Sequence, residues 1–312
     1  MLIDLLLVVL SLAMLYFGAE WLLAGSSALA RRLGVSALVI GLTVVSYGTS
    51  FPELLVSVQA AWAGLPDIAV GNVVGSNIFN VAVILALAAI ISAPKVDVAL
   101  IRRDAPLMIG VVLVAVLMLL DGRVGRLEGL LLFSGVVAYT WASLWASRRE
   151  EKASAVAVDV TIPQLGWLGL GWRILAGLAL LGVGSNLLVL GSTGLANAFG
   201  VSEAIIGLTI VSAGTSMPEL ATSILGAMRG HSALAIGNVI GSNIFNILCI
   251  LGLTAMILPL EAGGITQLDL WTMLVVCVLV WPIIWSGRQI SRAEGGLLLG
   301  IYAIYLGALL WK

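Results

Sequence analysis

Two glutamates stand among hydroxyl-bearing residues in stretches of sequence that are otherwise apolar. If Glu53 lies on a helix, the polar residues three, four and seven positions before it share its face, because such positions recur on successive helical turns. These residues are Ser50, Thr49 and Ser46. The same residue types at the same spacing recur further along the chain, at Ser212, Thr215, Ser216 and Glu219.

A second kind of polar stripe follows each of these segments. Its members are one helical turn apart, and they are Asn72, Ser76 and Asn80 in the first copy and Asn238, Ser242 and Asn246 in the second. Each pair of neighbouring segments is joined by a short connection, so we expect an antiparallel hairpin whose two stripes face each other.

All of these side chains offer oxygen, as carboxylate, amide or hydroxyl. Oxygen ligands suit hard cations such as Ca²⁺ and Na⁺ and do not suit Zn²⁺ or copper. No Lys or Arg lies in the interiors of the four segments, so Glu53 and Glu219 have no protein cation to neutralise them. A carboxylate within a membrane span is costly unless it faces a cavity or a partner. The alternatives are a bound, transported cation or a structural hydrogen bond between helices.

Proline and glycine predict where the two glutamate-bearing helices break. Pro52 and Pro218 immediately precede the glutamates, and proline can neither donate its helical hydrogen bond nor fit against the carbonyl four residues earlier. With Gly48 and Gly214 one turn before, we expect breaks near 48–52 and 214–218. Carbonyls released there would point at the site, and we expect these to be the carbonyls of Ser46 and Ser212.

The composition requires these segments to lie in a membrane. Of the 312 residues, 61% are hydrophobic and only 10% are charged, whereas a soluble domain carries about 25% charged residues. Apolar runs long enough to span a bilayer recur along the whole chain. We predict an all-α integral membrane protein with ten spans, near Leu2–Ala30, Ser36–Ala63, Asp67–Ile91, Ala105–Leu120, Leu127–Trp145, Trp167–Ala198, Ser202–Met228, Ser232–Met256, Leu270–Trp285 and Gly295–Trp311.

The chain contains an internal duplication. Residues 41–90 align with 207–256 without gaps, and 28 of the 50 positions are identical. We therefore predict a first five-helix repeat at 1–146, a linker at 147–165 and a second repeat at 166–312. Because five is odd, the second repeat enters the membrane from the opposite side. Inverted repeats are typical of secondary transporters, which place the substrate site where the repeats meet. Channels and membrane enzymes can also be duplicated, so the repeat alone leaves the class open.

The basic residues predict the orientation. Twelve of the 15 lie in alternate connections, and these are Arg31, Arg32, Lys95, Arg102, Arg103, Arg148, Arg149, Lys152, Arg173, Arg229, Arg288 and Arg292. The side richer in Lys and Arg is normally cytoplasmic. We expect a multi-pass plasma (inner) membrane protein with both termini outside and the 147–165 linker in the cytoplasm. The first residues lack a basic region and a cleavage site, so we expect the first span to be retained.

The motifs around the stripes closely resemble the α-repeats of the sodium/calcium exchangers, in the cation/calcium exchanger superfamily. They read Gly-Thr-Ser-Phe-Pro-Glu at 48–53, Gly-Thr-Ser-Met-Pro-Glu at 214–219, and Gly-Ser-Asn-Ile-Phe-Asn at 75–80 and again at 241–246. The resemblance implies a Na⁺/Ca²⁺ antiporter that works by alternating access. It assigns ion coordination to Glu53, Glu219, Thr49, Ser50, Thr215, Ser216, Ser76, Asn80, Ser242 and Asn246, and to the carbonyls of Ser46 and Ser212.

Two departures from the family's pattern bear on coupling and regulation. Potassium-dependent relatives carry Asp where this chain has Asn246, so K⁺ co-transport is not favoured. The 147–165 linker is too short for the calcium-sensing insert of animal exchangers.

Other functions remain open from the sequence. Coupling to H⁺ or K⁺ on the same fold is the main alternative. A passive channel is a further one, and a membrane metalloenzyme is disfavoured by the single histidine. We expect no enzymatic activity, no cofactor and no nucleic-acid partner. The expected partners are inorganic cations and the lipid bilayer. Glu20, inside the first span, is expected to pack between helices or at a cavity edge rather than to bind ions.

Overall fold

The computed structural model describes residues 2–151, 166–198 and 212–311, and these ranges are almost entirely helical. The elements of the first part are α1 (Leu2–Leu33), α2 (Ala37–Ile40), η1 (Gly41–Val45), α3 (Ser46–Thr49), α4 (Phe51–Trp62), α5 (Pro66–Phe79), η2 (Asn80–Leu85), α6 (Ala86–Ser92), η3 (Leu100–Asp104), α7 (Ala105–Leu119), β1 (Arg123–Val124) and α8 (Arg126–Glu151). Those of the second part are α9 (Trp167–Ala198), α11 (Ser212–Thr215), α12 (Met217–Met228), α13 (Ser232–Phe245), η5 (Asn246–Leu251), α14 (Gly252–Ile257), β2 (Leu260–Glu261), α15 (Gln267–Gly287) and α16 (Arg292–Leu310). The η segments are π-helical turns.

Several of these helices are long and apolar enough to cross a membrane. The described residues contain six such helices, or seven if Ala37–Thr49 and Phe51–Trp62 count as one bent span. Except at their ends, helices satisfy their backbone hydrogen bonds internally, as a bilayer demands. Every predicted span coincides with a helix or a run of helices, except that the beginning of the predicted Ser202–Met228 span lies outside the described residues. Helix α8 continues to Glu151, so its last residues fall in the predicted 147–165 linker, and the remainder of that linker is not described.

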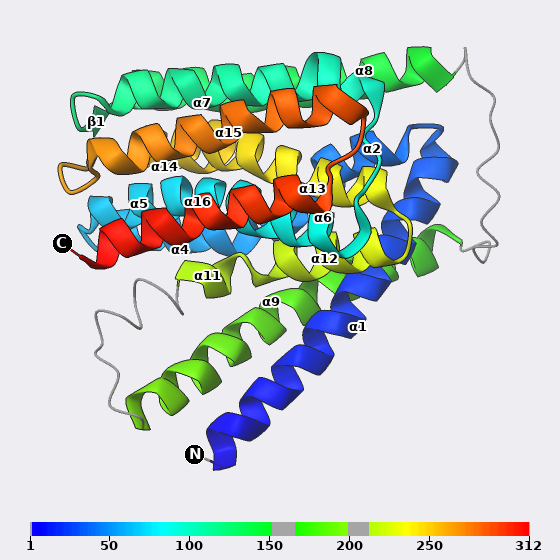
Figure 1. Cartoon of the computed structure of the whole chain (residues 1–312), viewed down its shortest axis with the longest axis horizontal. Helices are drawn as coiled ribbons and strands as arrows, with labels where there is room; N and C mark the ends of the chain where they lie inside the picture. Colours follow the sequence, from blue (N-terminus) through cyan, green and yellow to red (C-terminus); the bar gives the residue numbers. More distant parts are fainter. Residues whose placement is uncertain (1, 152–165, 199–211, 312) are drawn as a thin grey trace.

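Most helices lie side by side in one bundle, and α1 and α9 form a pair that leans away from it (Figure 1). The pair is held together by close backbone approach at glycines. A Cβ on Gly177 would lie 2.8 Å from the Leu22 nitrogen, and one on Gly18 would lie 3.0 Å from the Gly177 oxygen. Small residues allow such contact between membrane helices.

Short strand pairings join the connections at the ends of the bundle. Strand β1 pairs antiparallel with β2, which sets Arg123 opposite Glu261. A single bridge joins Lys95 to Gln289, in the connection between α15 and α16, which lies at the opposite end of the bundle from β1 in Figure 1. The two pairings involve equivalent residues, since Lys95 and Glu261 are 166 positions apart, as are Arg123 and Gln289.

The two parts of the chain meet where α13 packs against η1, and glycine makes that contact possible. A Cβ on Gly237 would lie 2.9 Å from the Leu38 carbonyl oxygen and 3.2 Å from the Leu42 nitrogen, both of them backbone atoms. A Cβ on the repeat-equivalent Gly71 would meet only the Ile265 Cδ1, at 3.5 Å. The same residue type is therefore required at one position and not at the other.

Gly237→Ala is accordingly expected to destabilise the fold by about 1–3 kcal/mol, the usual cost of overpacking a close contact. Gly71→Ala is the matched control and should leave stability unchanged or slightly raised, because alanine favours a helix over glycine. The measurement is the melting temperature of each purified variant in detergent. Equal melting temperatures for the two variants would contradict the close packing of α13 on η1.

Candidate cation site

The predicted helix breaks are confirmed at equivalent serines. Ser50 separates α3 from α4, with φ −83° and ψ 6°, and Ser216 separates α11 from α12, with φ −88° and ψ 9°. Pro52 and Pro218 are the second residues of the helices that follow. There a missing N–H costs nothing, because the first amides of a helix have no partner within it. The first break bends the chain by 44°.

Each broken helix contributes a serine that hydrogen-bonds the glutamate of the other. Ser50 Oγ donates to Glu219 Oε1 at 2.8 Å, and Ser216 Oγ lies 3.1 Å from Glu53 Oε1. Both carboxylates are buried, with 1% and 0% of the residue exposed. This crossed pair of contacts brings residues 169 and 163 positions apart in the sequence into one site.

Each of the two carboxylates has one oxygen that is still available to bind a ligand. Glu53 Oε2 and Glu219 Oε2 are buried and accept no hydrogen bond from the described residues. Neither glutamate forms an ion pair with any residue in the described ranges. A buried charge without a partner is strongly unfavourable, so this arrangement suits a bound cation.

Two asparagines support the site rather than supplying free oxygens to it. Asn72 Nδ2 donates to Ser57 Oγ at 2.9 Å and to the Glu53 carbonyl at 3.0 Å. The Asn72 Oδ1 accepts from the Thr215 hydroxyl at 3.5 Å. The equivalent Asn238 repeats this pattern, donating to Ser223 Oγ at 3.0 Å and to the Glu219 carbonyl at 3.4 Å, and accepting from Thr49 Oγ1 at 3.2 Å.

The second pair of stripes adds further oxygens. Ser76 Oγ lies 3.3 Å from Ser216 Oγ, which places it beside the crossed contacts. Asn80, Ser242 and Asn246 are fully buried, at 0–1% exposure. Their oxygens Asn80 Oδ1, Ser242 Oγ and Asn246 Oδ1 accept no hydrogen bond from the described residues, and they remain available as ligands.

The predicted carbonyl ligands are the exception. The Ser46 carbonyl is not released by the break, because it accepts the Ser50 amide at 2.9 Å and lies 3.3 Å from the Thr49 hydroxyl. Pro52 removes the hydrogen bond to Gly48, four residues earlier, and leaves the one to Ser46 intact. Ser212 is the first described residue of α11, and its role as a ligand stays a prediction.

Two serines of the site were missed by sequence reasoning. Ser57 and Ser223 hold the amides of Asn72 and Asn238. Each lies four residues after a glutamate and is identical in both repeats, so the helical spacing used for the other stripe residues would have found them.

Glu20 forms an ion pair that the sequence did not predict. Its Oε1 accepts from Arg229 at 2.7 Å, and the same guanidinium donates to the Tyr16 hydroxyl at 3.1 Å. Both charged side chains are partly exposed. The contact links α1 to the end of α12, in line with the expected role in helix packing.

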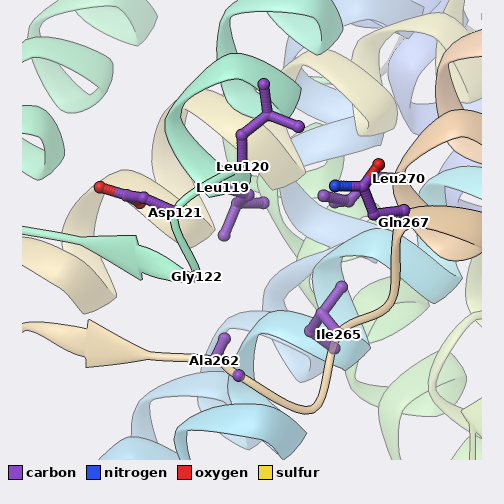
Figure 2. Close-up of a pocket in the computed structure, with 9 residues that line it drawn as sticks. Leu119, Leu120, Asp121, Gly122, Ala262, Ile265, Gln267 and Leu270 are labelled. Carbon is purple, nitrogen blue, oxygen red and sulfur yellow. The ribbon is translucent and has the colours of Figure 1, made fainter.

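A surface pocket of about 250 Å³ lies elsewhere, beside β1 and β2. Asp121 and Gln267 lie on opposite sides of it (Figure 2), and Leu119, Leu120, Ile265 and Leu270 supply its apolar wall. None of the predicted cation ligands lines this pocket.

The whole chain is similar to known proteins. A family model described as sodium/calcium exchanger protein matches residues 3–145 and 170–311. The putative antiporter CaxA of Alkalimonas amylolytica is 37% identical over 98% of this chain and 98% of its own length. The sodium/calcium exchanger MaX1 of Methanosarcina acetivorans is 29% identical over 99% of both chains. Among solved structures, the sodium-calcium exchanger NCX_Mj, soaked with 2.5 mM Na⁺ and 0.1 mM Ca²⁺, has a TM-score of 0.85 and 31% identity over 98% of both chains.

Proposed function

The chain belongs to the sodium/calcium exchanger family, and from this premise we propose that it exchanges Na⁺ for Ca²⁺ across a membrane by alternating access. The observation that carries the proposal is the crossed contact of Ser50 with Glu219 and of Ser216 with Glu53. It holds two buried carboxylates in one site without a neutralising Lys or Arg among the described residues.

The proposed ligands are the oxygens that surround these carboxylates. They are Glu53, Glu219, Thr49, Ser50, Thr215, Ser216, Ser76, Asn80, Ser242 and Asn246, with the carbonyls of Ser46 and Ser212. Ca²⁺ takes about 6–8 oxygens in loose geometry, which this mixture of carboxylate, amide and hydroxyl can supply. Thr49 and Thr215 would turn from Asn238 and Asn72 to do so.

Competition for one pair of carboxylates explains exchange. Two carboxylates neutralise one Ca²⁺, and they balance several Na⁺ ions at a similar net charge. Ca²⁺ and Na⁺ then cannot occupy the site together without leaving excess positive charge in a buried place. Binding of one ion therefore favours release of the other.

We propose further that the chain is two inverted repeats of five spans each, 1–146 and 166–312. Equivalent contacts support this: the Asn72–Ser57 hydrogen bond is matched by Asn238–Ser223, and η2 and η5 begin at the equivalent Asn80 and Asn246. The Arg123–Glu261 and Lys95–Gln289 pairings extend the correspondence to the outer helices.

The coupling ion is tested in vesicles that contain the purified protein. We expect outwardly directed Na⁺ gradients to drive ⁴⁵Ca²⁺ uptake, and equal gradients of K⁺ or H⁺ to drive none. Uptake that ignores Na⁺ and follows the pH gradient would establish the proton-coupled alternative. An absolute requirement for K⁺ would establish the potassium-coupled one.

Orientation is part of the proposal, and the distribution of basic residues predicts both termini outside and the 147–165 linker in the cytoplasm. In a background without Cys249 and Cys277, Arg149→Cys is expected to react with an impermeant thiol reagent only from the cytoplasmic side. Arg123→Cys, at an exposed position in β1, is the matched control and should react only from outside. The reverse pattern of labelling would overturn the proposed orientation.

A further inference from the structure

Asn243 is not among the proposed ligands, yet its side chain connects the two parts of the chain next to one of them. It lies on α13 and is fully buried. Its Nδ2 donates to the Asn77 backbone carbonyl at 3.3 Å, and its Oδ1 accepts from Asn80 Nδ2 at 3.0 Å. Asn243 therefore contacts the first repeat at the point where α5 becomes η2.

These contacts determine which way the Asn80 amide faces. A backbone carbonyl can only accept, so the group of Asn243 that meets the Asn77 carbonyl must be its nitrogen. The nearby Met108 and Cys277 sulfurs, each 3.8 Å from that nitrogen, are compatible with a donor. The Asn243 Oδ1 must then face Asn80 as an acceptor, and Asn80 must donate to it with its Nδ2. The Asn80 Oδ1 is left facing away from Asn243, buried and without a described partner.

That orientation matters because only the oxygen of an amide can bind a cation. A free asparagine can rotate its side chain and present the nitrogen instead, which would repel Ca²⁺ or Na⁺. We propose that Asn243 is a positioning residue of the cation site, which holds the Asn80 carbonyl oxygen ready to bind. This inference rests on the proposed function and deepens it.

The equivalent pair of asparagines, with the roles of the two repeats exchanged, is not connected in this way. Asn77 and Asn246 are the counterparts of Asn243 and Asn80, but Asn77 Nδ2 donates to Val73 in its own helix, at 2.7 Å. The Asn77 Oδ1 and both amide atoms of Asn246 have no described hydrogen-bond partner. The two ligand amides are therefore unequal: that of Asn80 is oriented by the protein, and that of Asn246 is free to follow the ion.

The asymmetry supplies a matched control. Asn243→Leu removes both hydrogen bonds and keeps the number and branching of the side-chain heavy atoms, and we expect the Ca²⁺ concentration for half-maximal Na⁺-driven uptake to rise about tenfold, equivalent to about 1.4 kcal/mol. The maximal rate per folded protein should change little, because the ligand is misoriented and not lost. Asn77→Leu makes the same change at an equally buried position, and half-saturation should rise less than about threefold, as its amide touches no ligand side chain.

A carboxylate at position 80 tests orientation directly, since it carries an oxygen at each end and needs no positioning. In an Asn80→Asp background, adding Asn243→Leu is expected to change half-saturation less than about threefold, although the same change costs about tenfold in the wild type. An equal factor in both backgrounds would overturn the proposal, because packing damage does not depend on the group at position 80. Equal effects of Asn77→Leu and Asn243→Leu would overturn it as well.

Folding and function are checked separately. Melting curves and size-exclusion profiles in detergent report folding, and Asn243→Ala repeats the test with a smaller side chain. If both Asn243 variants fail to fold while Asn77→Leu folds, Asn243 serves stability and the inference is wrong. Wild-type protein without Na⁺-driven uptake would refute the proposed function itself. Wild-type exchange with unchanged half-saturation in folded Asn243→Leu would refute only the positioning role.

Discussion

Glu53→Gln and Glu219→Gln are each expected to abolish Ca²⁺ transport in protein that remains folded. Gln keeps the oxygen that accepts from Ser216 or Ser50, so the crossed contacts between the broken helices can persist. It removes the charge, which leaves one carboxylate where Ca²⁺ needs two. Losing one partner of a buried charge pair costs about 3–5 kcal/mol, which corresponds to at least a hundredfold loss of affinity.

The measurement is ⁴⁵Ca²⁺ uptake at equal amounts of folded protein. Glu20→Gln is the matched control, because Glu20 is also a carboxylate within an apolar helix but is paired with the partly exposed Arg229. Exposed ion pairs contribute little, so this variant should transport normally. Near-normal flux in either site variant would show that its carboxylate is structural.

Asn246→Asp is expected to keep Ca²⁺ transport and to change its ion coupling or its pH dependence. Both amide atoms of Asn246 are buried without a described partner, so the substitution breaks no hydrogen bond that the structure describes. A third carboxylate in a site without a protein cation must be neutralised, either by a further cation or by a proton. Added cation binding would bring a requirement for K⁺ or extra Na⁺. Protonation would give near-normal exchange at neutral pH and a changed profile at higher pH.

The experiment is Na⁺-driven Ca²⁺ uptake across a pH series, with and without K⁺. A shift of about tenfold in the concentration of the coupling ion or of protons at half-maximal rate is the scale expected for one added charge in a buried site, about 1.4 kcal/mol. Curves that superimpose on those of the wild type throughout would mean that Asn246 does not face the ions, and its assignment as a ligand would be withdrawn.

The helix breaks could be predicted because their causes are local. Pro52 and Pro218 act on the carbonyl four residues earlier, and the structure has the breaks at Ser50 and Ser216. The expected release of the Ser46 carbonyl is wrong, because the carbonyl that loses its hydrogen bond to Pro52 is that of Gly48. The assignment of the Ser46 carbonyl as a ligand stays a prediction.

The partners across the site could not be predicted. Helical spacing shows which residues share a face, and it does not show which helix lies opposite. Within one hairpin the expected facing of stripes is seen where Asn72 donates to the Glu53 carbonyl. The contacts that join the carboxylates instead cross between the repeats, from Ser50 to Glu219 and from Ser216 to Glu53.

The difference between the Asn243–Asn80 pair and the Asn77–Asn246 pair could not be predicted from the sequence either. Asn77 and Asn243 stand in identical Gly-Ser-Asn-Ile-Phe-Asn motifs, yet only the Asn243 side chain reaches across to the other repeat. Surrounding helices decide this, and no local signal distinguishes the two. The ion pair between Glu20 and Arg229 could not be predicted for the same reason, since it joins helices far apart in the sequence.

Net movement of Ca²⁺ against its own gradient tests the central claim most directly. Vesicles that contain the wild-type protein are prepared with equal Ca²⁺ concentrations inside and outside, and an outwardly directed Na⁺ gradient is then imposed. Exchange at one shared site predicts that internal Ca²⁺ rises above external Ca²⁺ as Na⁺ leaves, and that Glu53→Gln vesicles show no rise. Internal Ca²⁺ that stays equal to external Ca²⁺ while Na⁺ runs down would contradict exchange at this site.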